Sequence, residues 1–307
     1  MMHGSVHARG VALRATARRW TARPGKVAVL VLVAWCCLSV SPCQGGMINL
    51  GQAGDFTVLG LTGTHIAVSG HSGVVGDLGV GPSGLGDFSG SSYVTGTTFV
   101  DPTGGIKTSG SASIHPATRH LAPAVSDALQ ASAQVAAMAA TQTFGDIKNS
   151  LTITGNGGTN VIAAQSVRLS GSETLTLVGG PSDSFLFNVP GRFVLSGTSS
   201  IHLSGGVLPT NVLFNVLGSE KGGTVEFTGK SLAIGTFLIP DRSFSLGPAV
   251  LEGSVIAGGE DLRIHSGGYV GQTPPPVDTA PEPAGLTLVA VGALAFAGYG
   301  WRRARKS

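Results

Sequence analysis

Side chains that could perform acid–base or metal chemistry are few in this chain and widely separated. The central part holds six histidines: His65, His71, His115, His120, His202 and His265. None of them has the paired spacing of a zinc site or of a metalloprotease helix. Four carboxylates could meet in space as an acid pair or an exposed calcium site: Asp77, Asp241, Glu260 and Asp261. No pattern selects these residues, so we predict no catalytic residue, no metal ion and no cofactor.

Two glycine motifs resemble nucleotide-binding signatures but lack the context that those signatures need. Residues 79–84 (Gly-x-Gly-x-x-Gly) match a dinucleotide fingerprint, which requires a helix directly after it, and the next residues are again rich in glycine. Residues 229–231 (Gly-Lys-Ser) match the end of a phosphate-binding loop, but Thr224 stands where the first glycine of that loop is required. Both motifs therefore predict tight turns between strands.

The basic character of the whole chain comes from its two ends. Of 19 basic residues, six precede the first long apolar run and four end the chain. Between Gly46 and Ala280 this leaves nine basic and 15 acidic residues, a net charge of −6. Binding to nucleic acid requires a basic surface to neutralise phosphates. We therefore predict that the body of the protein binds neither DNA nor RNA.

The first 45 residues have the pattern of a secretory signal peptide. Basic residues precede the apolar run Val27 to Val40, and small and polar residues follow it. This pattern predicts export by the Sec machinery, with cleavage between Ser41 and Gly46. A lipoprotein anchor at Cys43 is the alternative, but Pro42 occupies a position that requires a small residue. All three cysteines lie at or before Cys43, so we expect a mature domain without disulfides.

The C-terminal segment predicts a second, temporary membrane element. Residues 284–301 are apolar and just long enough to span a bilayer as a helix. The basic cluster that follows should stay in the cytoplasm by the positive-inside rule: Arg302, Arg303, Arg305 and Lys306. The alternative is a buried C-terminal helix, which fits poorly because a cationic run directly follows the apolar block.

Three elements at this end, in order, resemble a PEP-CTERM sorting signal over residues 281–307. They are Pro281-Glu282-Pro283, the apolar segment and the terminal basic cluster. The resemblance implies cleavage by an exosortase-type enzyme in a Gram-negative bacterium. It also implies transient anchoring in the inner membrane, followed by display on the cell surface or release into the extracellular matrix. Residues 271–280 would be the Pro-rich linker before this signal.

Residues 46–270 predict a single, mainly β domain. Short runs of Val, Ile, Leu, Phe and Thr are punctuated by Ser-Gly, Thr-Gly or Gly-Gly, as expected for many short strands joined by tight turns. Five such runs end in a repeated hydroxyl-glycine pair, at residues 68–70, 169–171, 195–197, 203–205 and 227–229. The repetition favours a β-solenoid, in which stacked coils bury one side of every strand and glycines serve the corners.

One segment interrupts the strand pattern and predicts a helix at about 117–147. It is rich in alanine, with Pro123 near its start and larger apolar residues at mostly helical spacing. Those residues are Leu121, Val125, Leu129, Val135 and Met138. We expect this apolar stripe to pack permanently against one flank of the solenoid.

The domain resembles two related families over most of its length. Residues 50–60 (LGQAGDFTVLG) and 74–82 (VVGDLGVGP) are similar to the opening of the DUF3494 ice-binding-like family, and residues 185–189 and 212–216 resemble its later strands. Residues 235–242 and 251–259 look equally like choice-of-anchor A domains of bacterial surface proteins. The first resemblance implies a right-handed β-solenoid with one long flanking α-helix.

Ice binding by such a fold implies a flat outer surface of Thr, Ser and Ala. The candidates for ice or surface contact are Thr152, Thr154, Thr174 and Thr176. We therefore predict an exported, non-enzymatic surface or matrix protein with an ice-binding or adhesive role. The alternative is a carbohydrate-active solenoid enzyme acting on extracellular polysaccharide, which the scarcity of aromatic residues disfavours, since Tyr93 and Tyr269 are the only tyrosines of the domain.

Overall fold

The computed structural model describes residues 49–219 and 223–271. The predicted signal peptide, the linker beyond Gly271 and the sorting signal lie outside the described residues. Among the described residues, no helix is long and apolar enough to cross a membrane.

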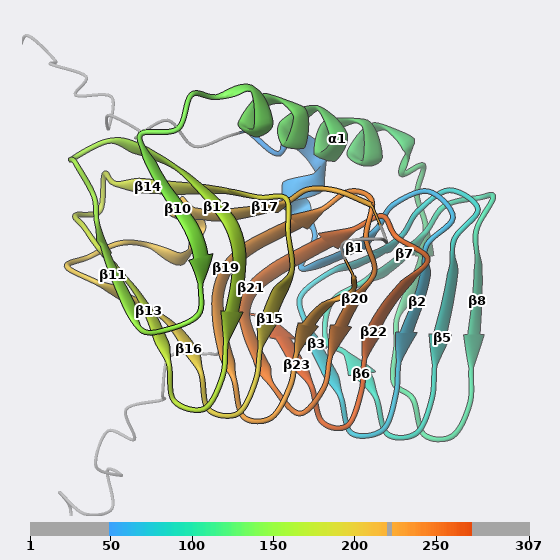
Figure 1. Ribbon diagram of the computed structural model, residues 1–307. Helices are drawn as coiled ribbons and strands as arrows, with labels where there is room; N and C mark the ends of the chain where they lie inside the picture. The colour runs from blue at the N-terminus through green and yellow to red at the C-terminus, as the bar shows by residue number, and fades with distance from the viewer. Residues whose placement is uncertain (1–48, 220–222, 272–307) are drawn as a thin grey trace, which may run out of the picture. The chain divides into compact units, whose positions relative to one another are not determined.

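The described residues form a solenoid of parallel β-strands with one α-helix beside it (Figure 1). Each turn of the chain passes along three sides of the solenoid, and its strands pair in parallel with those of the neighbouring coil, as β2 (His65–Val68) pairs with β5 (Leu85–Phe88) and β5 with β8 (Gly105–Thr108). The prediction of a mainly β solenoid with a flanking helix is confirmed. The strands make up three faces, which we name the helix face, the charged face and the hydroxyl face.

The helix face is the widest. Across it, in spatial order, run β10 (Gln142–Ile147), β12 (Thr159–Leu169), β14 (Ser184–Val189), β17 (Val212–Val216), β19 (Leu232–Ile239), β21 (Val250–Ala257), β1 (Val58–Gly60), β4 (Leu78–Val80), β7 (Thr98–Val100) and β9 (Pro116–Thr118). The strands β12, β19 and β21 are long enough to turn a corner and continue on a second face. Two short 3₁₀ helices, η1 (Gly51–Asp55) and η2 (Pro209–Asn211), lie outside the faces.

The other two faces follow the same order of coils. The charged face contains the end of β12, then β15 (Phe193–Leu195), β18 (Val225–Phe227), β20 (Phe244–Leu246), β22 (Asp261–Ile264), β2 (His65–Val68), β5 (Leu85–Phe88) and β8 (Gly105–Thr108). The hydroxyl face contains β11 (Leu151–Thr154), β13 (Thr174–Val178), β16 (Ser200–Ser204), the starts of β19 and β21, β23 (Tyr269–Gly271), β3 (Gly73–Val75) and β6 (Tyr93–Val94).

The coils do not stack in sequence order. The last coil pairs with the first, because β21, β22 and β23 lie in parallel beside β1, β2 and β3. The N-terminal coils then continue outward to β9, while β10 begins at the opposite end of the stack (Figure 1). The helix α1 (Ala122–Ala137) connects these two ends.

The helix α1 is shorter than the predicted 117–147. The residues before it form β9, and Gln142–Ile147 form β10, which pairs with β12. Pro123 lies in the first turn, the one place where a helix accommodates proline without loss of a hydrogen bond. Met138 has an extended backbone and ends the helix. Thr143 and Phe144 are good strand formers, so the pairing with β12 overrides the alanine-rich pattern before them.

The buried side of α1 also differs from the prediction. Leu121, Val125 and Val135 are buried as expected, but Leu129 and Met138 are exposed. Alanines complete the buried side instead: Ala124, Ala128 and Ala131. Small side chains let the helix backbone lie close to the strands, where it covers the outward-pointing apolar residues of the helix face in a second core: Leu59, Val161, Leu186, Leu213, Leu238 and Ile256.

Two asparagines of the repeated Phe-Asn-Val segments hold the helix in place. Asn188 Nδ2 donates to Val135 O at 2.7 Å, and Asn215 Nδ2 donates to Ser132 O at 3.0 Å. Ser132 Oγ in turn donates to Asn215 Oδ1 at 2.7 Å. Asn188 and Asn215 are register partners on β14 and β17. The two Phe-Asn-Val segments therefore share one role, because both anchor α1.

The interior of the solenoid contains ladders of like residues. Phe187, Phe214 and Phe237 stack with ring centroids 4.6 and 4.7 Å apart. At the corners, the glycines of the predicted hydroxyl-glycine pairs have positive φ, for example 62° at Gly171 and 72° at Gly197. The predicted role of these glycines at the corners is confirmed.

Candidate functional site

The four predicted threonines lie together at one end of the hydroxyl face. Thr152 pairs in register with Thr176 on the neighbouring strand, and Thr154 and Thr174 occupy the adjacent outward positions of the same two strands. Thr152 and Thr154 are exposed, while Thr174 and Thr176 are half-buried. The next strand continues the pattern with Ser200, His202 and Ser204. We call these seven residues the hydroxyl patch.

Two carboxylates hold the threonine strands at their two ends. Before the strands, the Glu173 carboxylate accepts hydrogen bonds from the backbone N–H and the hydroxyl of Ser150, and these bonds lower the pKa of Glu173. Ser150 Oγ then accepts a bond of 3.0 Å from the backbone N–H of Thr174. The strands β11 and β13 are thus joined where they begin.

After the strands, Asp183 joins the two turns that follow β11 and β13. Its Oδ1 accepts bonds from the backbone N–H of Gly157 at 2.7 Å and of Gly158 at 3.1 Å, and its Oδ2 accepts from Gly180 N–H at 2.8 Å. Burial alone would raise the pKa of Asp183, but these bonds and one from Asn160 outweigh it and lower the pKa. Hydrogen bonds to carboxylates therefore join the two threonine strands both before and after the threonines.

The hydroxyl face and the charged face differ sharply in charge. Among the outward-pointing residues of the hydroxyl-face strands, Glu252 is the only charged side chain within the described part of the chain. On the charged face, one register row alone carries five charged side chains: Arg168, Glu226, Arg263, Asp87 and Lys107. The middle of the helix face is covered by α1. The hydroxyl face is therefore the one exposed face with few charges.

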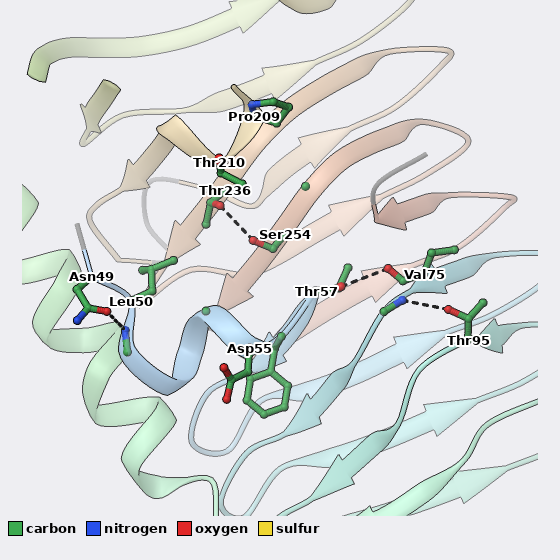
Figure 2. A pocket seen from close by; sticks show the side chains of 15 residues that line it. Asn49, Leu50, Asp55, Thr57, Val75, Thr95, Pro209, Thr210, Thr236 and Ser254 are labelled. Carbon is green, nitrogen blue, oxygen red and sulfur yellow. Dashed lines mark hydrogen bonds between the residues drawn. The ribbon is translucent and has the colours of Figure 1, made fainter. Parts of the chain in front are cut away.

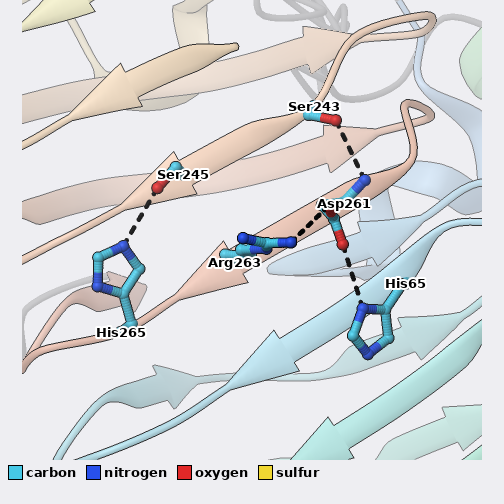
Figure 3. A network of polar contacts seen from close by, with 6 residues as sticks. All are labelled: His65, Ser243, Ser245, Asp261, Arg263 and His265. Carbon is cyan, nitrogen blue, oxygen red and sulfur yellow. Dashed lines mark hydrogen bonds and ion pairs between the residues drawn. The ribbon is translucent and has the colours of Figure 1, made fainter.

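A polar network on the charged face tests the enzyme alternative (Figure 3). His65 Nδ1 lies 3.1 Å from Asp261 Oδ1, and Asp261 Oδ2 accepts a bond of 2.7 Å from Arg263. His265 Nε2 lies 3.2 Å from Ser245 Oγ. A hydrolytic triad needs one histidine between a serine and a carboxylate. Here the carboxylate and the serine contact different histidines, so the network does not form a triad.

Of the other sequence candidates, Asp77 and Asp261 contact different partners. Of the four carboxylates considered for an acid pair, Asp261 contacts His65, while Asp77 accepts a bond from the backbone of Thr97 at 2.7 Å. Over residues 49–219 and 223–271, no three His, Cys, Asp or Glu side chains lie close enough to hold a metal ion. The two glycine motifs form turns between strands, β4 to β5 and β18 to β19, as predicted.

A pocket of about 990 Å³ lies at the corner between the hydroxyl face and the helix face (Figure 2). Five hydroxyl side chains line it: Thr57, Thr95, Thr210, Thr236 and Ser254. Asp55 is the single carboxylate among its lining residues. Hydrolysis of a glycosidic bond generally requires two carboxylates across the bond. The lining of this corner pocket therefore supports binding better than catalysis.

Comparison with known proteins identifies the domain. The family model described as ice-binding-like matches residues 60–258. The chain belongs to this ice-binding-like family. An ice-binding protein from Flammulina populicola is 30% identical over 199 residues, which cover 59% of this chain and 74% of that protein.

Solved structures of ice-binding proteins share the fold of the ice-binding-like domain. One from an Antarctic Flavobacteriaceae bacterium aligns with a TM-score of 0.56 and 21% identity, covering 77% of this chain and 49% of that one. Another, from an Arctic yeast, aligns with a TM-score of 0.53 and 19% identity over 76% of this chain and 97% of that one. At these identities the likeness concerns the fold.

Sequence reasoning missed one juxtaposition on the hydroxyl face. Tyr93 and Tyr269, far apart in the chain, lie on either side of Gly73 in one register row. No local pattern links the two tyrosines, because the pairing depends on the last coil docking against the first.

Proposed function

We propose that this protein is a non-enzymatic ice-binding protein and that the hydroxyl patch contacts ice. The observation that carries the proposal is the pairing of Thr152 with Thr176, beside Thr154 and Thr174, on the one exposed face with few charges. Membership of the ice-binding-like family supports it.

The physical reason is the regular spacing of small amphipathic groups. Neighbouring strands are about 4.8 Å apart, and outward positions along a strand repeat about every 6.7 Å. Threonine presents both a hydroxyl and a methyl group, so a flat array of threonines can hold water molecules in a fixed arrangement. A charged side chain would impose its own strong hydration on that arrangement. The charged face is therefore a poor alternative for ice contact.

The proposal includes export and sorting. The signal peptide at 1–45 would direct the chain to the Sec machinery, and Pro281-Glu282-Pro283 would direct cleavage by an exosortase-type enzyme. The order of motif, apolar segment and basic cluster supports this part. Mass spectrometry of the protein recovered from its host should show a C-terminus near residue 281. Glu282→Ala should leave the tail attached, and unchanged processing of that variant would count against the assignment.

Ice-crystal growth and thermal hysteresis test the ice-binding part directly. We expect the purified protein to shape ice crystals and lower their growth temperature, and the double variant Thr174→Asp, Thr176→Asp to lose both effects. Circular dichroism should show that the variant keeps its fold. An inactive parent protein would contradict the proposal, and an active, folded double variant would contradict the assignment to the hydroxyl patch.

A further inference from the structure

The tyrosine pair of the hydroxyl face forms a platform on three adjacent strands. Tyr269 on β23, Gly73 on β3 and Tyr93 on β6 are register partners, and all point outward because Val270, Val74 and Val94 beside them are buried. We call these three residues the tyrosine platform.

The ring of Tyr93 covers the backbone of Gly73. A Cβ atom at Gly73 would lie 2.2 Å from Tyr93 Cζ, so any other residue at that position would displace the ring. Tyr93 is nevertheless 36% exposed. Burial is the main cause that raises the pKa of Tyr269, and the proximity of Tyr93 and Glu252 adds to it. The two phenols thus share one surface, bordered by a carboxylate.

This platform leads into the corner pocket. Two residues further along the chain, Val75 follows Gly73 on β3, and Thr95 follows Tyr93 directly after β6. Both Val75 and Thr95 line the pocket. Thr95 Oγ1 accepts a bond of 3.1 Å from Gly76 N–H, and on the neighbouring strands of the pocket wall Ser254 Oγ donates a bond of 3.1 Å to Thr236 Oγ1 (Figure 2). An aromatic surface is therefore continuous with a hollow lined by hydroxyl groups.

The charges around this surface restrict its ligand. Glu252 borders the platform, and Asp55 lines the pocket, where it is paired with Arg119 at 3.1 Å. Glu252 would repel a polyanion. The nearby cation, Arg119, is already paired with Asp55. Aromatic faces accept the C–H surface of a sugar ring, while hydroxyl and carboxylate groups bond to sugar hydroxyls.

We propose that the tyrosine platform and the corner pocket form one binding site for a neutral polysaccharide. The site is separate from the hydroxyl patch and does not depend on ice binding. It holds the sugar without cleaving it, because its two carboxylates are not presented as a catalytic pair: Asp55 lines the pocket and is paired with Arg119, whereas Glu252 borders the platform and does not line the pocket.

Affinity electrophoresis of the purified full chain in gels containing dextran, laminarin or alginate tests this proposal. We expect retardation by at least one of the neutral glucans and none by the anionic alginate. Tyr93→Ala should weaken the binding about tenfold, through loss of one aromatic contact. Lack of retardation by both glucans, or stronger retardation by alginate, would overturn the proposal.

Two further variants separate binding from a purely structural role of the ring over Gly73. Tyr93→Leu keeps an apolar cover over the glycine but removes the aromatic face, so it should bind as weakly as Tyr93→Ala while melting closer to the parent. Tyr93→Phe keeps the ring and should retain most of the binding. Thr152→Asp changes the hydroxyl patch and should bind glucan like the parent. Equal binding by the parent and Tyr93→Leu would overturn the role of the platform.

Discussion

A single carboxylate, Asp183, connects the turns that follow two of the threonine strands. Its pKa is lower in the folded protein than its usual value of 3.8. A group with a lowered folded pKa adds stability above its unfolded pKa, and this stability is lost as the pH falls through the lower folded pKa. The hydroxyl patch should therefore lose support in acid.

Melting curves at several pH values test the role of Asp183. Between about pH 7 and about pH 3, we expect the melting temperature of the parent to fall most steeply below about pH 4. Asp183→Asn should be less stable at neutral pH and should show a shallower fall in acid. Asp241→Asn, at an exposed position, serves as the control. Parallel curves for the parent and Asp183→Asn would contradict the argument.

The corner glycines allow a comparison of two otherwise similar residues. Gly171 and Gly197 both have positive φ, but a Cβ at Gly197 would lie 2.8 Å from Gly171 O, whereas a Cβ at Gly171 would meet no atom within 4 Å. Gly171→Ala should cost about 1–2 kcal/mol of unfolding free energy from backbone strain alone. Gly197→Ala should cost more, because the neighbouring coil must also move. Urea denaturation measures both, and equal losses would show that the coils do not pack as closely as described.

At the scale of elements, the sequence predicts local structure where a residue type is tied to one backbone conformation or to one side of a strand. The hydroxyl-glycine pairs predict corners because positive φ favours glycine, and the Thr-x-Thr pairs predict outward positions because strands alternate. The predicted helix is too long because alanine does not mark an end. Its buried side differs from the prediction because alanines, rather than Leu129 and Met138, lie against the strands. Its two asparagine anchors come from distant strands, so the helix segment itself cannot reveal them.

The anchoring of α1 makes a prediction about stability. Asn215→Ala removes the bonds to Ser132 and leaves buried polar groups of the helix without that partner, which should cost about 1–3 kcal/mol. For a domain of this size, the loss corresponds to a fall in melting temperature of about 2–4 °C per kcal/mol. Gln134→Ala, on the exposed side of the same helix, should change little. Equal melting temperatures for Asn215→Ala and Gln134→Ala would show that Asn215 does not anchor the helix.

At the scale of the whole molecule, the decisive feature is the docking of the last coil against the first. Contacts across this junction join residues far apart in the chain, such as His65 and Asp261, and no repeat in the sequence specifies them. The solenoid was therefore predictable, but the order of its coils was not. The right-handed sense of the coil stays a prediction from the family resemblance.

The same docking places chemically different surfaces on one molecule. The hydroxyl patch lies on coils formed after the helix, whereas the tyrosine platform combines the first two coils with the last. The two proposed binding sites can therefore be changed independently, and a protein that binds both ice and polysaccharide could link a matrix to ice.

Partitioning of the protein into a slowly growing ice body tests the central claim most directly. We predict that the parent is enriched in the ice fraction, that Thr152→Asp, Thr176→Asp is excluded from it, and that Val194→Asp is enriched like the parent. Val194 points outward on the charged face, so this control adds a charge beside existing charges. Exclusion of the parent, or equal enrichment of the folded threonine variant, would contradict ice binding by the hydroxyl patch.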